Sequence, residues 1–554
     1  MAVVPYLFIF QGIDFTDKGL TIALGEQMLK WPDVYAKYSP IWLTGAFTHV
    51  WFRLFPIKGL LGLNILFVLL LQLNAVLSYS FFRKYYTRSV LLPALCIGMI
   101  VSITLSRSSF GYHSFTVFVL SAAILALLNG LKENKGLYIL LSGILCALSG
   151  LVRIPNILSV LFILYIILFY LLLGKKLSIS SLSFFVVGLI VGFGIDYALI
   201  ALTGFSHYYV SGVQQMFFHL KDAHNFHNPS QLASANLNDF ISIIIQSTKY
   251  LVFFTVVIYA ASFFQLAFIN VSDYKRFAPL LFIASVFIAW FTARHNDAAY
   301  ILKFHFKYVM PGILAALFIL SASTVKNNLK EKILLLISTL LVYVVSFAGS
   351  SSGMNPAGLL LFLILCIAET LSFLDIPVTG ERFINFFTRN FILFSLTILI
   401  ILAAVINIKF VHRDVNNRAE LRYSIHHPLL AGVYTNKQRA DCVNGLLDAL
   451  SSRVKPGDTL WAAPALPVMY PLTGCVPFAR QVWEDGTDLE NVPPNSFPLI
   501  IKAKGSVKND NWPMDVNLGK DPDFLKEESV MNNFISSNHY TKKWENGFFE
   551  IWTR

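Results

Sequence analysis

Charged residues are scarce in this sequence. Asp, Glu, Lys and Arg together make up 13% of the 554 residues, whereas a soluble globular chain carries about 25%. Hydrophobic residues make up 56% of the chain, and its mean hydropathy is +0.63. This composition excludes a soluble globular protein and predicts a chain that crosses a membrane many times.

Cysteine is scarce as well, with five residues in the chain. Cys96, Cys146 and Cys366 lie inside apolar runs, where a thiol behaves as a small hydrophobic side chain. Cys442 and Cys475 share a polar region that we place outside the membrane, so the chain has room there for one disulfide.

The sequence also lacks a basic run typical of nucleic-acid binding and any internal repeat. The formal net charge is +12, but the cations are dispersed through short loops and form no basic run interleaved with aromatic residues. This pattern argues against nucleic-acid binding. The sequence also contains no internal repeat and no low-complexity tract, which argues against a transporter built from two matched halves.

Apolar runs fill the first 409 residues. A helix needs about 20 apolar residues to cross about 30 Å of hydrocarbon, and the chain contains about thirteen such candidates if one short run is counted. They are residues 3–13 (the short run), 59–82, 90–105, 115–131, 136–152, 157–173, 182–203, 240–267, 277–291, 309–322, 333–347, 357–374 and 391–408. We therefore expect a polytopic α-helical membrane protein.

Lys and Arg gather in alternate connections between these runs. Cytoplasmic loops are the ones enriched in Lys and Arg. The basic loops contain Arg83, Lys84, Arg88, Lys132, Lys135, Lys175, Lys176, Lys275, Arg276, Lys326, Lys330, Lys332, Arg382 and Arg389. We take these basic loops as cytoplasmic. The outer face of the inner (plasma) membrane then carries the loops at residues 14–56, 153, 203–239 and 294–307 and everything after residue 410.

The first apolar run, residues 3–13, is too short for an ordinary spanning helix, and no basic residue precedes it. Either the true start lies upstream, or a short or tilted helix crosses a thinned bilayer. The run lacks a charged leader and a small-residue cleavage site, so it is not a signal peptide.

The composition changes abruptly after residue 410. Pro, Asp, Asn, Lys and Glu become common, and no later run is long enough to span a bilayer. We expect a transmembrane domain at residues 1–409 and a small soluble extracytoplasmic α/β domain at residues 410–554. Within the second domain, the pattern predicts a helix over residues 437–450 and strands over residues 459–462, 499–502 and 548–552.

The first outer loop, residues 14–56, is unlike a simple connector. Residues 19–29 have helical spacing, and aromatic residues that suit a membrane interface follow them. These are Trp31, Tyr35, Tyr38, Trp42, Trp51 and Phe52. We therefore expect interfacial helices in this loop.

Asp14 and Asp17 stand at the start of that loop, directly after the first apolar run. Their spacing of three places both carboxylates on one face if helix begins there. Such carboxylates suit general-base chemistry at the membrane edge. The alternative is that one or both are solvated N-caps for the following helix, for which Asp and Thr are well suited.

The chain resembles the GT-C superfamily of integral membrane glycosyltransferases, which includes protein O-mannosyltransferases and lipid A aminoarabinose transferases. Residues 13–19, Ile-Asp-Phe-Thr-Asp-Lys-Gly, are similar to the acidic motif in the long first outer loop of that superfamily. Residues 142–156 look like its glycine-rich helix that ends in a basic residue and proline, and residues 307–311 look like its basic-aromatic-x-x-Pro helix start. Lys18 replaces an acid that often follows, which leaves open which aspartate is the base.

The resemblance implies a polyprenyl-phosphate sugar donor and therefore a phosphate leaving group at headgroup level. Arg153 and Lys307 are the cations we expect to bind this phosphate; the alternative for each is anchoring to lipid headgroups. Asp17 is our first candidate for the base, and Asp14 the second, in a single inverting displacement. Either could instead bind a divalent cation or orient the donor sugar.

Other polar residues on the outer face are weaker candidates. Tyr112, His113, Arg294 and His295 are candidates for the pocket. Residues 203–239 are rich in histidine. Their Asn and Pro residues favour a loop over a helix that would place histidines on one face, so we favour contact with the acceptor or the donor over metal ligation.

The sequence therefore predicts a glycosyltransferase that moves one sugar from a lipid-linked donor to an envelope glycan, lipid or protein. A lipid-linked glycan transporter or flippase is the alternative from another class, but it needs ionisable residues in mid-span, and most spans here are clean apart from Asp196. An O-antigen polymerase or ligase is a third interpretation, which would need paired arginines in a large outer loop.

Overall fold

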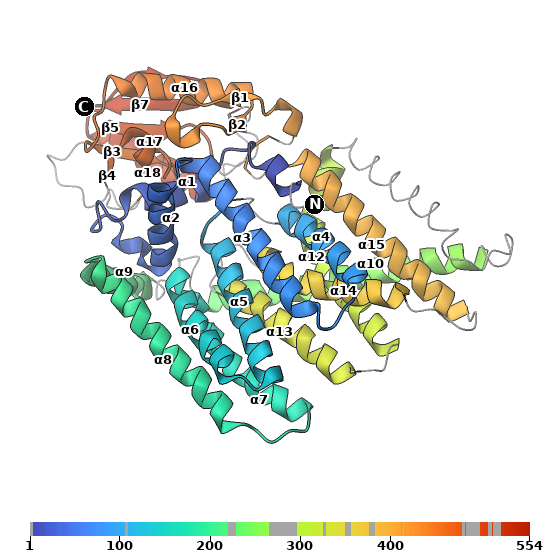
Figure 1. The fold of residues 1–554 in the computed structure, drawn as a ribbon. Helices are drawn as coiled ribbons and strands as arrows, with labels where there is room; N and C mark the ends of the chain where they lie inside the picture. The colour runs from blue at the N-terminus through green and yellow to red at the C-terminus, as the bar shows by residue number, and fades with distance from the viewer. Residues whose placement is uncertain are drawn as a thin grey trace.

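The structure is a computed structural model that describes residues 4–105, 109–219, 229–264, 296–324, 328–348, 356–375, 383–411, 413–415, 417–478, 482, 499–507, 512–513 and 522–554. A body of helices makes up most of it, and a small sheet with its own helices lies at one end (Figure 1). We call the part up to residue 409 the helical body and the part after it the C-terminal unit.

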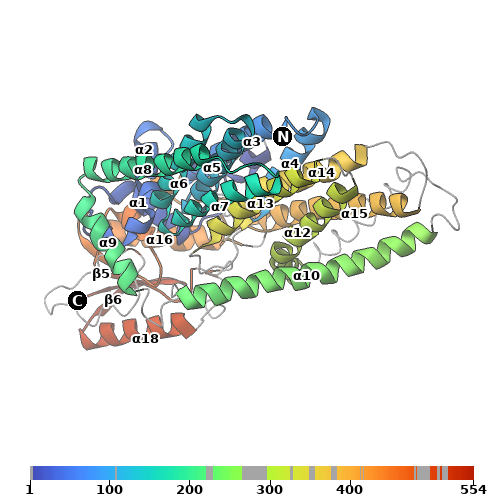
Figure 2. The same cartoon turned by 90° about the horizontal axis from the view of Figure 1, so that it is seen from below.

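Helices of different lengths, most of them apolar, build the helical body. They are α3 (Gly59–Phe82), α4 (Arg88–Leu105), α5 (Tyr112–Glu133), α6 (Gly136–Val152), α7 (Phe162–Leu172), α8 (Ile179–Leu202), α9 (Ser206–His219), α10 (Pro229–Phe264), α12 (Asn296–Thr324), α13 (Leu329–Phe347), α14 (Leu360–Asp375) and α15 (Phe383–Lys409). α8 and α10 lie on opposite sides of this body (Figure 2).

Five of the described helical segments are long and apolar enough to cross a membrane, and four more apolar helices are shorter. The five are Gly59–Phe82, Tyr112–Glu133, Ile154–Leu172, Ile179–Leu202 and Arg389–Lys409. The predicted class, a polytopic helical membrane protein with a small C-terminal α/β unit, is confirmed. The predicted run at residues 277–291 lies outside the described residues.

α6 and α8 pack closely against each other. A Cβ added at Gly143 would lie 2.3 Å from the carbonyl oxygen of Phe185, and one at Gly188 would lie 2.2 Å from that of Leu140. Only glycine fits at these two positions, because the backbones touch. Small residues that let backbones approach are the usual basis of helix packing in membranes.

The first apolar run does not form a helix that spans a membrane. Residues Val4–Phe8 form a short 3-10 helix, η1, and Gln11 then makes an isolated parallel bridge with Tyr434 of the C-terminal unit. The prediction of a short span over residues 3–13 is therefore wrong for the described part of this run. Ile9 and Ile13 of this run are buried in the main core, whereas Leu7 and Phe10 are exposed.

A five-stranded mixed sheet forms the core of the C-terminal unit, in the order β4-β3-β5-β7-β6. β3 (Thr459–Ala463) runs parallel to β4 (Val476–Pro477) and to β5 (Leu499–Ala503). β7 (Phe549–Thr553) runs antiparallel to β5 and to β6 (Thr541–Glu545). A separate antiparallel pair joins β1 (Tyr423–Ser424) to β2 (Tyr434–Thr435).

Alternate residues of β3 and β5 face opposite sides of the sheet, as the strand period requires. Trp461 and Ile500 pack on α18 (Pro522–Ser537), where the Trp461 ring lies 5.6 Å from that of Phe534. Leu460 and Ile501 belong instead to the main core, which includes α16 (Lys437–Ser451) and α17 (Met469–Thr473) and continues into the helical body. The C-terminal unit therefore shares one core with the helical body.

The predicted elements of this unit match the observed helix α16 and strands β3, β5 and β7 to within about one residue at each end. The sequence pattern did not predict β6. Its residues Thr-Lys-Lys-Trp-Glu are mostly exposed and lack apolar alternation, because β6 is an edge strand and charged residues protect such edges. Cys442 and Cys475 both carry free thiols, so the structure does not pair them.

The first loop, residues 14–56, lies between the long helices of the body and the C-terminal unit (Figure 1). It contains α1 (Asp17–Gln27), η2 (Ala36–Ile41) and α2 (Trp42–Leu54). The side chain of Gln27 donates to the carbonyl oxygens of Tyr470 and Cys475 at 3.0 and 3.2 Å. Most residues of α1 are buried, so this helix is enclosed between the two parts rather than lying with one face in water.

Candidate functional site

Asp14 lies in the turn that leads into α1. Its Oδ1 accepts a hydrogen bond from the backbone N–H of Thr16 at 2.9 Å and from the Thr16 hydroxyl at 2.6 Å. Its Oδ2 accepts from the N–H of Lys18 at 3.4 Å. Asp14 therefore accepts N–H groups at the start of the helix, although the N-cap position itself is Thr16. The capping alternative predicted a solvated side chain, whereas that of Asp14 is buried.

Asp17 is the first residue of α1, and it lies beside Asp14. Arg413 Nη1 is 2.7 Å from Asp17 Oδ2 and 3.5 Å from Asp14 Oδ1, so one cation joins the two acids. The Asp17 side chain is 17% exposed, whereas that of Asp14 is 0% exposed. Of this acid pair, Asp14 and Asp17, only Asp17 is open enough to meet a substrate.

Residues 413–414, which follow the last helix of the body, contact the turn that contains Asp14. Asp414 accepts the backbone N–H of Ile13 at 2.9 Å and pairs with Arg439 Nη1 at 3.0 Å. Arg439 also donates to the carbonyl oxygen of Arg413 at 2.8 Å, and its guanidinium stacks 4.2 Å from the ring centre of Trp512. The first loop and the C-terminal unit are therefore joined by buried charges at the acid pair.

The electrostatics of the turn favour an ionised Asp14. Burial is the largest influence and raises the pKa of Asp14, but Arg413, Thr16 and Lys18 together bring it below its ordinary value of 3.8. Burial is also the main influence on Lys18 and lowers its pKa from 10.5 to about 8, although Asp14 and Asp414 oppose the shift. The site therefore combines a charged acid with an amine that loses its proton at lower pH than an ordinary lysine does.

The Lys18 amine makes stability depend on pH. Because its pKa is about 8 in the folded protein and its ordinary value is 10.5, the unfolded chain holds more protons between these values, and stability rises with pH across that window. We expect the melting temperature of the wild type to rise between about pH 8 and about pH 10 relative to that of Lys18→Met. A difference between the two melting curves that stays flat with pH would contradict the burial of a charged amine here.

Arg153 lies at the end of α6, where the helix stops as predicted. Its side chain is 4% exposed, and Nη1 and Nη2 donate to the carbonyl oxygens of Ser346 and Ala348 at 3.0 and 2.7 Å. These are carbonyls at the C-terminal end of α13, where a cation is favourable. Arg153 therefore lies inside the protein and is almost fully buried.

Tyr112 and His113 begin α5 beside Arg153. The Arg153 guanidinium lies 5.8 Å from the centre of the Tyr112 ring, and the rings of Tyr112 and His113 are 4.2 Å apart. Both side chains are half-buried. The structure thus brings together three of the residues that the sequence singled out.

A short series of contacts connects these residues to the acid pair. The Thr21 hydroxyl, one turn after Asp17, donates to the Asp17 carbonyl oxygen at 3.0 Å. A Cβ added at Gly111, the residue before α5, would lie 3.6 Å from the same Thr21 oxygen. The residue before α5 therefore comes close to the first turn of α1.

The remaining sequence candidates are placed in part or not at all. Lys307 lies in α12, but its side chain is outside the described residues, as are Arg294 and His295. The expected helix start at residues 307–311 is wrong, because α12 begins at Asn296 and continues through Pro311. Of the histidine-rich loop, His207 is exposed at the start of α9, and residues 220–228 are not described.

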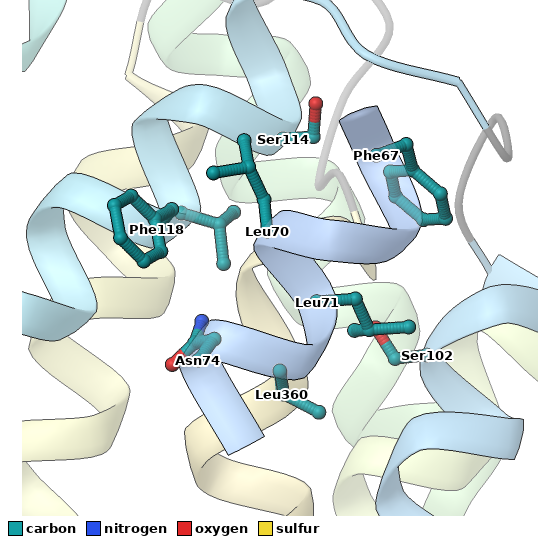
Figure 3. Close-up of a pocket in the computed structure, with 9 residues that line it drawn as sticks. Phe67, Leu70, Leu71, Asn74, Ser102, Ser114, Phe118 and Leu360 are labelled. Carbon is teal, nitrogen blue, oxygen red and sulfur yellow. The ribbon is translucent and has the colours of Figure 1, made fainter. Parts of the chain in front are cut away.

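Within the described ranges, no group of three or more His, Cys, Asp or Glu side chains is placed to hold a metal ion. A small cavity of about 30 Å³ lies between α3, α4, α5 and α14, and Asn74, Ser102 and Ser114 are its polar lining (Figure 3). It offers room for a water or two but not for a sugar. The acid pair remains the best candidate site in the part of the chain that the structure covers.

Arg413, Asp414 and Arg439 were not singled out from the sequence. The one available signal is that Arg413 and Asp414 are charged residues directly after the last apolar run. No sequence spacing relates them to Asp14 and Asp17, which lie about 400 positions earlier in the chain.

Comparisons with known proteins give one match. No family model matches the chain, and no curated protein matches it. Among solved structures, the chain is similar to the crystal structure of ArnT from Cupriavidus metallidurans bound to undecaprenyl phosphate, with 10% sequence identity and a TM-score of 0.41 over 100% of this chain and 96% of that one.

Proposed function

We propose that the protein is a membrane glycosyltransferase that moves one sugar from a polyprenyl-phosphate donor to an acceptor. The observation that carries this proposal is the acid pair, which joins a buried, ionised Asp14 to a partly exposed Asp17 through Arg413. The pair lies at the end of the helical body, where lipid-linked and water-borne substrates can meet. The acceptor is an envelope glycan, lipid or protein.

Asp17 serves as the general base in this proposal. Its carboxylate takes the proton from an acceptor hydroxyl while that oxygen bonds to the anomeric carbon of the donor. The bond from the anomeric carbon to the phosphate oxygen breaks in the same step, and its electron pair leaves with polyprenyl phosphate. The result is one inverting displacement without a covalent intermediate. Asp14 keeps the base in place by ordering the first turn of α1.

Arg153 and Lys307 bind the departing phosphate in this proposal. A guanidinium carries five N–H donors, so the two bonds of Arg153 to backbone carbonyls leave others for a phosphate oxygen. Those two bonds also fix the guanidinium in position before the donor arrives. A fixed cation that faces developing negative charge in a poorly hydrated site is a large source of rate enhancement.

In this proposal the two parts of the chain have different roles, and each faces a defined side of the membrane. The acid pair and the C-terminal unit face the extracytoplasmic side of the inner membrane, and the basic loops face the cytoplasm. Residues 1–409 form the catalytic membrane domain, and residues 410–554 form an extracytoplasmic domain that closes over the first loop. A divalent cation is a further candidate partner of the acids.

Turnover of lipid-linked sugars by the purified protein tests the proposal. Wild type in nanodiscs is offered a panel of polyprenyl-phosphate hexoses and pentoses together with envelope glycans, lipids and proteins as acceptors. Release of polyprenyl phosphate is measured with and without a chelator. We expect release from one donor only, with inversion at the anomeric carbon of the product. A loss of release on chelation would assign a cation to the acids. Well-folded protein that binds these lipids and cleaves none would overturn the proposal in favour of a lipid-glycan transporter.

A further inference from the structure

We infer that Arg413 is a positioning residue that holds the Asp17 carboxylate for proton transfer, which makes the segment after the last helix part of the active site. The inference rests on the function proposed above. Its basis is geometric: one nitrogen of Arg413 is 2.7 Å from Asp17 Oδ2 and 3.5 Å from Asp14 Oδ1. The same nitrogen donates to the Thr16 hydroxyl.

The backbone at Arg413 is specialised for this contact. Its φ is +55°, in the left-handed region that residues other than glycine rarely adopt. Two bonds hold the segment there: Arg439 donates to the Arg413 carbonyl oxygen at 2.8 Å, and Asp414 accepts the N–H of Ile13 at 2.9 Å. An unfavourable conformation held by buried partners is a feature of functional sites.

Arg413 acts on the acid pair in two ways. A charge-assisted bond fixes the orientation of the Asp17 carboxylate, so the oxygen that receives the proton is placed before substrate binds. Arg413 also balances the negative charges of Asp14 and Asp17, because its Nη1 lies close to both carboxylates. Without it, carboxylates this close repel one another, and the pair takes up a proton at higher pH. A protonated Asp17 cannot act as a base.

The charged groups around Arg413 come from both parts of the molecule. Asp14, Asp17 and Lys18 face it from the first loop. Asp414, Arg418 and Arg439 face the same cluster from the C-terminal side. Arg413 is the member of this cluster that bonds directly to the partly exposed acid.

Arg413→Gly is the variant that separates positioning from folding. Glycine adopts a φ of +55° without strain, so the backbone keeps its course while the guanidinium is lost. We expect kcat for the donor identified above to fall about 10- to 100-fold, with KM changed less than about threefold. We also expect the acidic limb of the kcat profile to move to higher pH. Arg413→Lys should recover part of kcat. The melting temperature of Arg413→Gly should fall less than that of a variant without Arg439, because the Arg413 side chain is partly exposed and that of Arg439 is fully buried.

Arg422→Ala is the matched control, because Arg422 is an exposed arginine of the same segment, and we expect wild-type kinetics from it. Wild-type kcat and an unshifted pH profile in Arg413→Gly would overturn the inference and leave the proposed function standing. A raised KM with unchanged kcat would also overturn it and make Arg413 a ligand of the donor phosphate. If the wild type cleaves no donor at all, the proposed function fails first, and the inference fails with it.

Discussion

Asp17→Asn is expected to abolish sugar transfer and to leave donor binding nearly intact. Asparagine keeps the size of the side chain and its place at the first turn of α1, but it cannot accept a proton at neutral pH. Loss of a general base costs about 10² to 10⁴ in rate, so kcat should fall by at least that factor. The measurement is release of polyprenyl phosphate at saturating donor, together with the donor Kd from a binding assay.

Asp14→Asn is the matched comparison for this substitution. Asp14 is buried and accepts N–H groups at the start of α1. Asp14→Asn should therefore lower the melting temperature more than Asp17→Asn does. Because Asp14 acts through the turn rather than on substrate, its effect on kcat should be the smaller one. Retained turnover in Asp17→Asn would move the base to Asp14 or away from this loop altogether.

Arg439→Met is expected to have the largest effect on folding. Arg439 is fully buried and bonds Asp414 Oδ1, the Arg413 carbonyl oxygen and the Trp512 carbonyl oxygen. Removal of one partner of a buried ion pair costs about 3–5 kcal/mol, since the other charge is left without compensation. We expect a clear drop in melting temperature and faster proteolysis of the C-terminal unit.

Two further variants show whether the cost comes from the buried charge. Arg453→Met removes an exposed arginine that follows the same helix and should leave the melting temperature nearly unchanged. Asp414→Asn combined with Arg439→Met should recover part of the lost stability, because no charge is then left buried without a partner. A melting temperature like that of wild type in Arg439→Met alone would contradict the role of this pair in joining the two parts.

Much of the helical body could be predicted from the sequence, because hydrophobicity over about 20 residues is a local property. The run at residues 136–152 coincides with α6, and the helix ends at Arg153 as predicted. The same holds for α16 and β3, whose amphipathic or apolar patterns lie next to turn residues. The run at residues 3–13 misled the prediction, because apolar residues that meet another part of the protein have the same composition as those that meet lipid.

The candidate site could be predicted only in its local part. Asp14 and Asp17 stand out because two acids follow an apolar run, and their contact with the start of α1 follows from their spacing. Arg413 could not be found in this way, since its contact with Asp17 depends on how the whole chain folds back. The helix start expected near Lys307 failed because proline removes one backbone bond but does not always end a helix.

The most direct test of the account is to locate the bound donor. An electron cryo-microscopy map of Asp17→Asn in nanodiscs, loaded with the donor found in the panel, would show both ends of the sugar–phosphate bond. The account predicts the phosphate against Arg153 and the anomeric carbon facing residue 17 at the start of α1. Density for the donor elsewhere in the protein, with residue 17 and Arg153 both out of its reach, would contradict it.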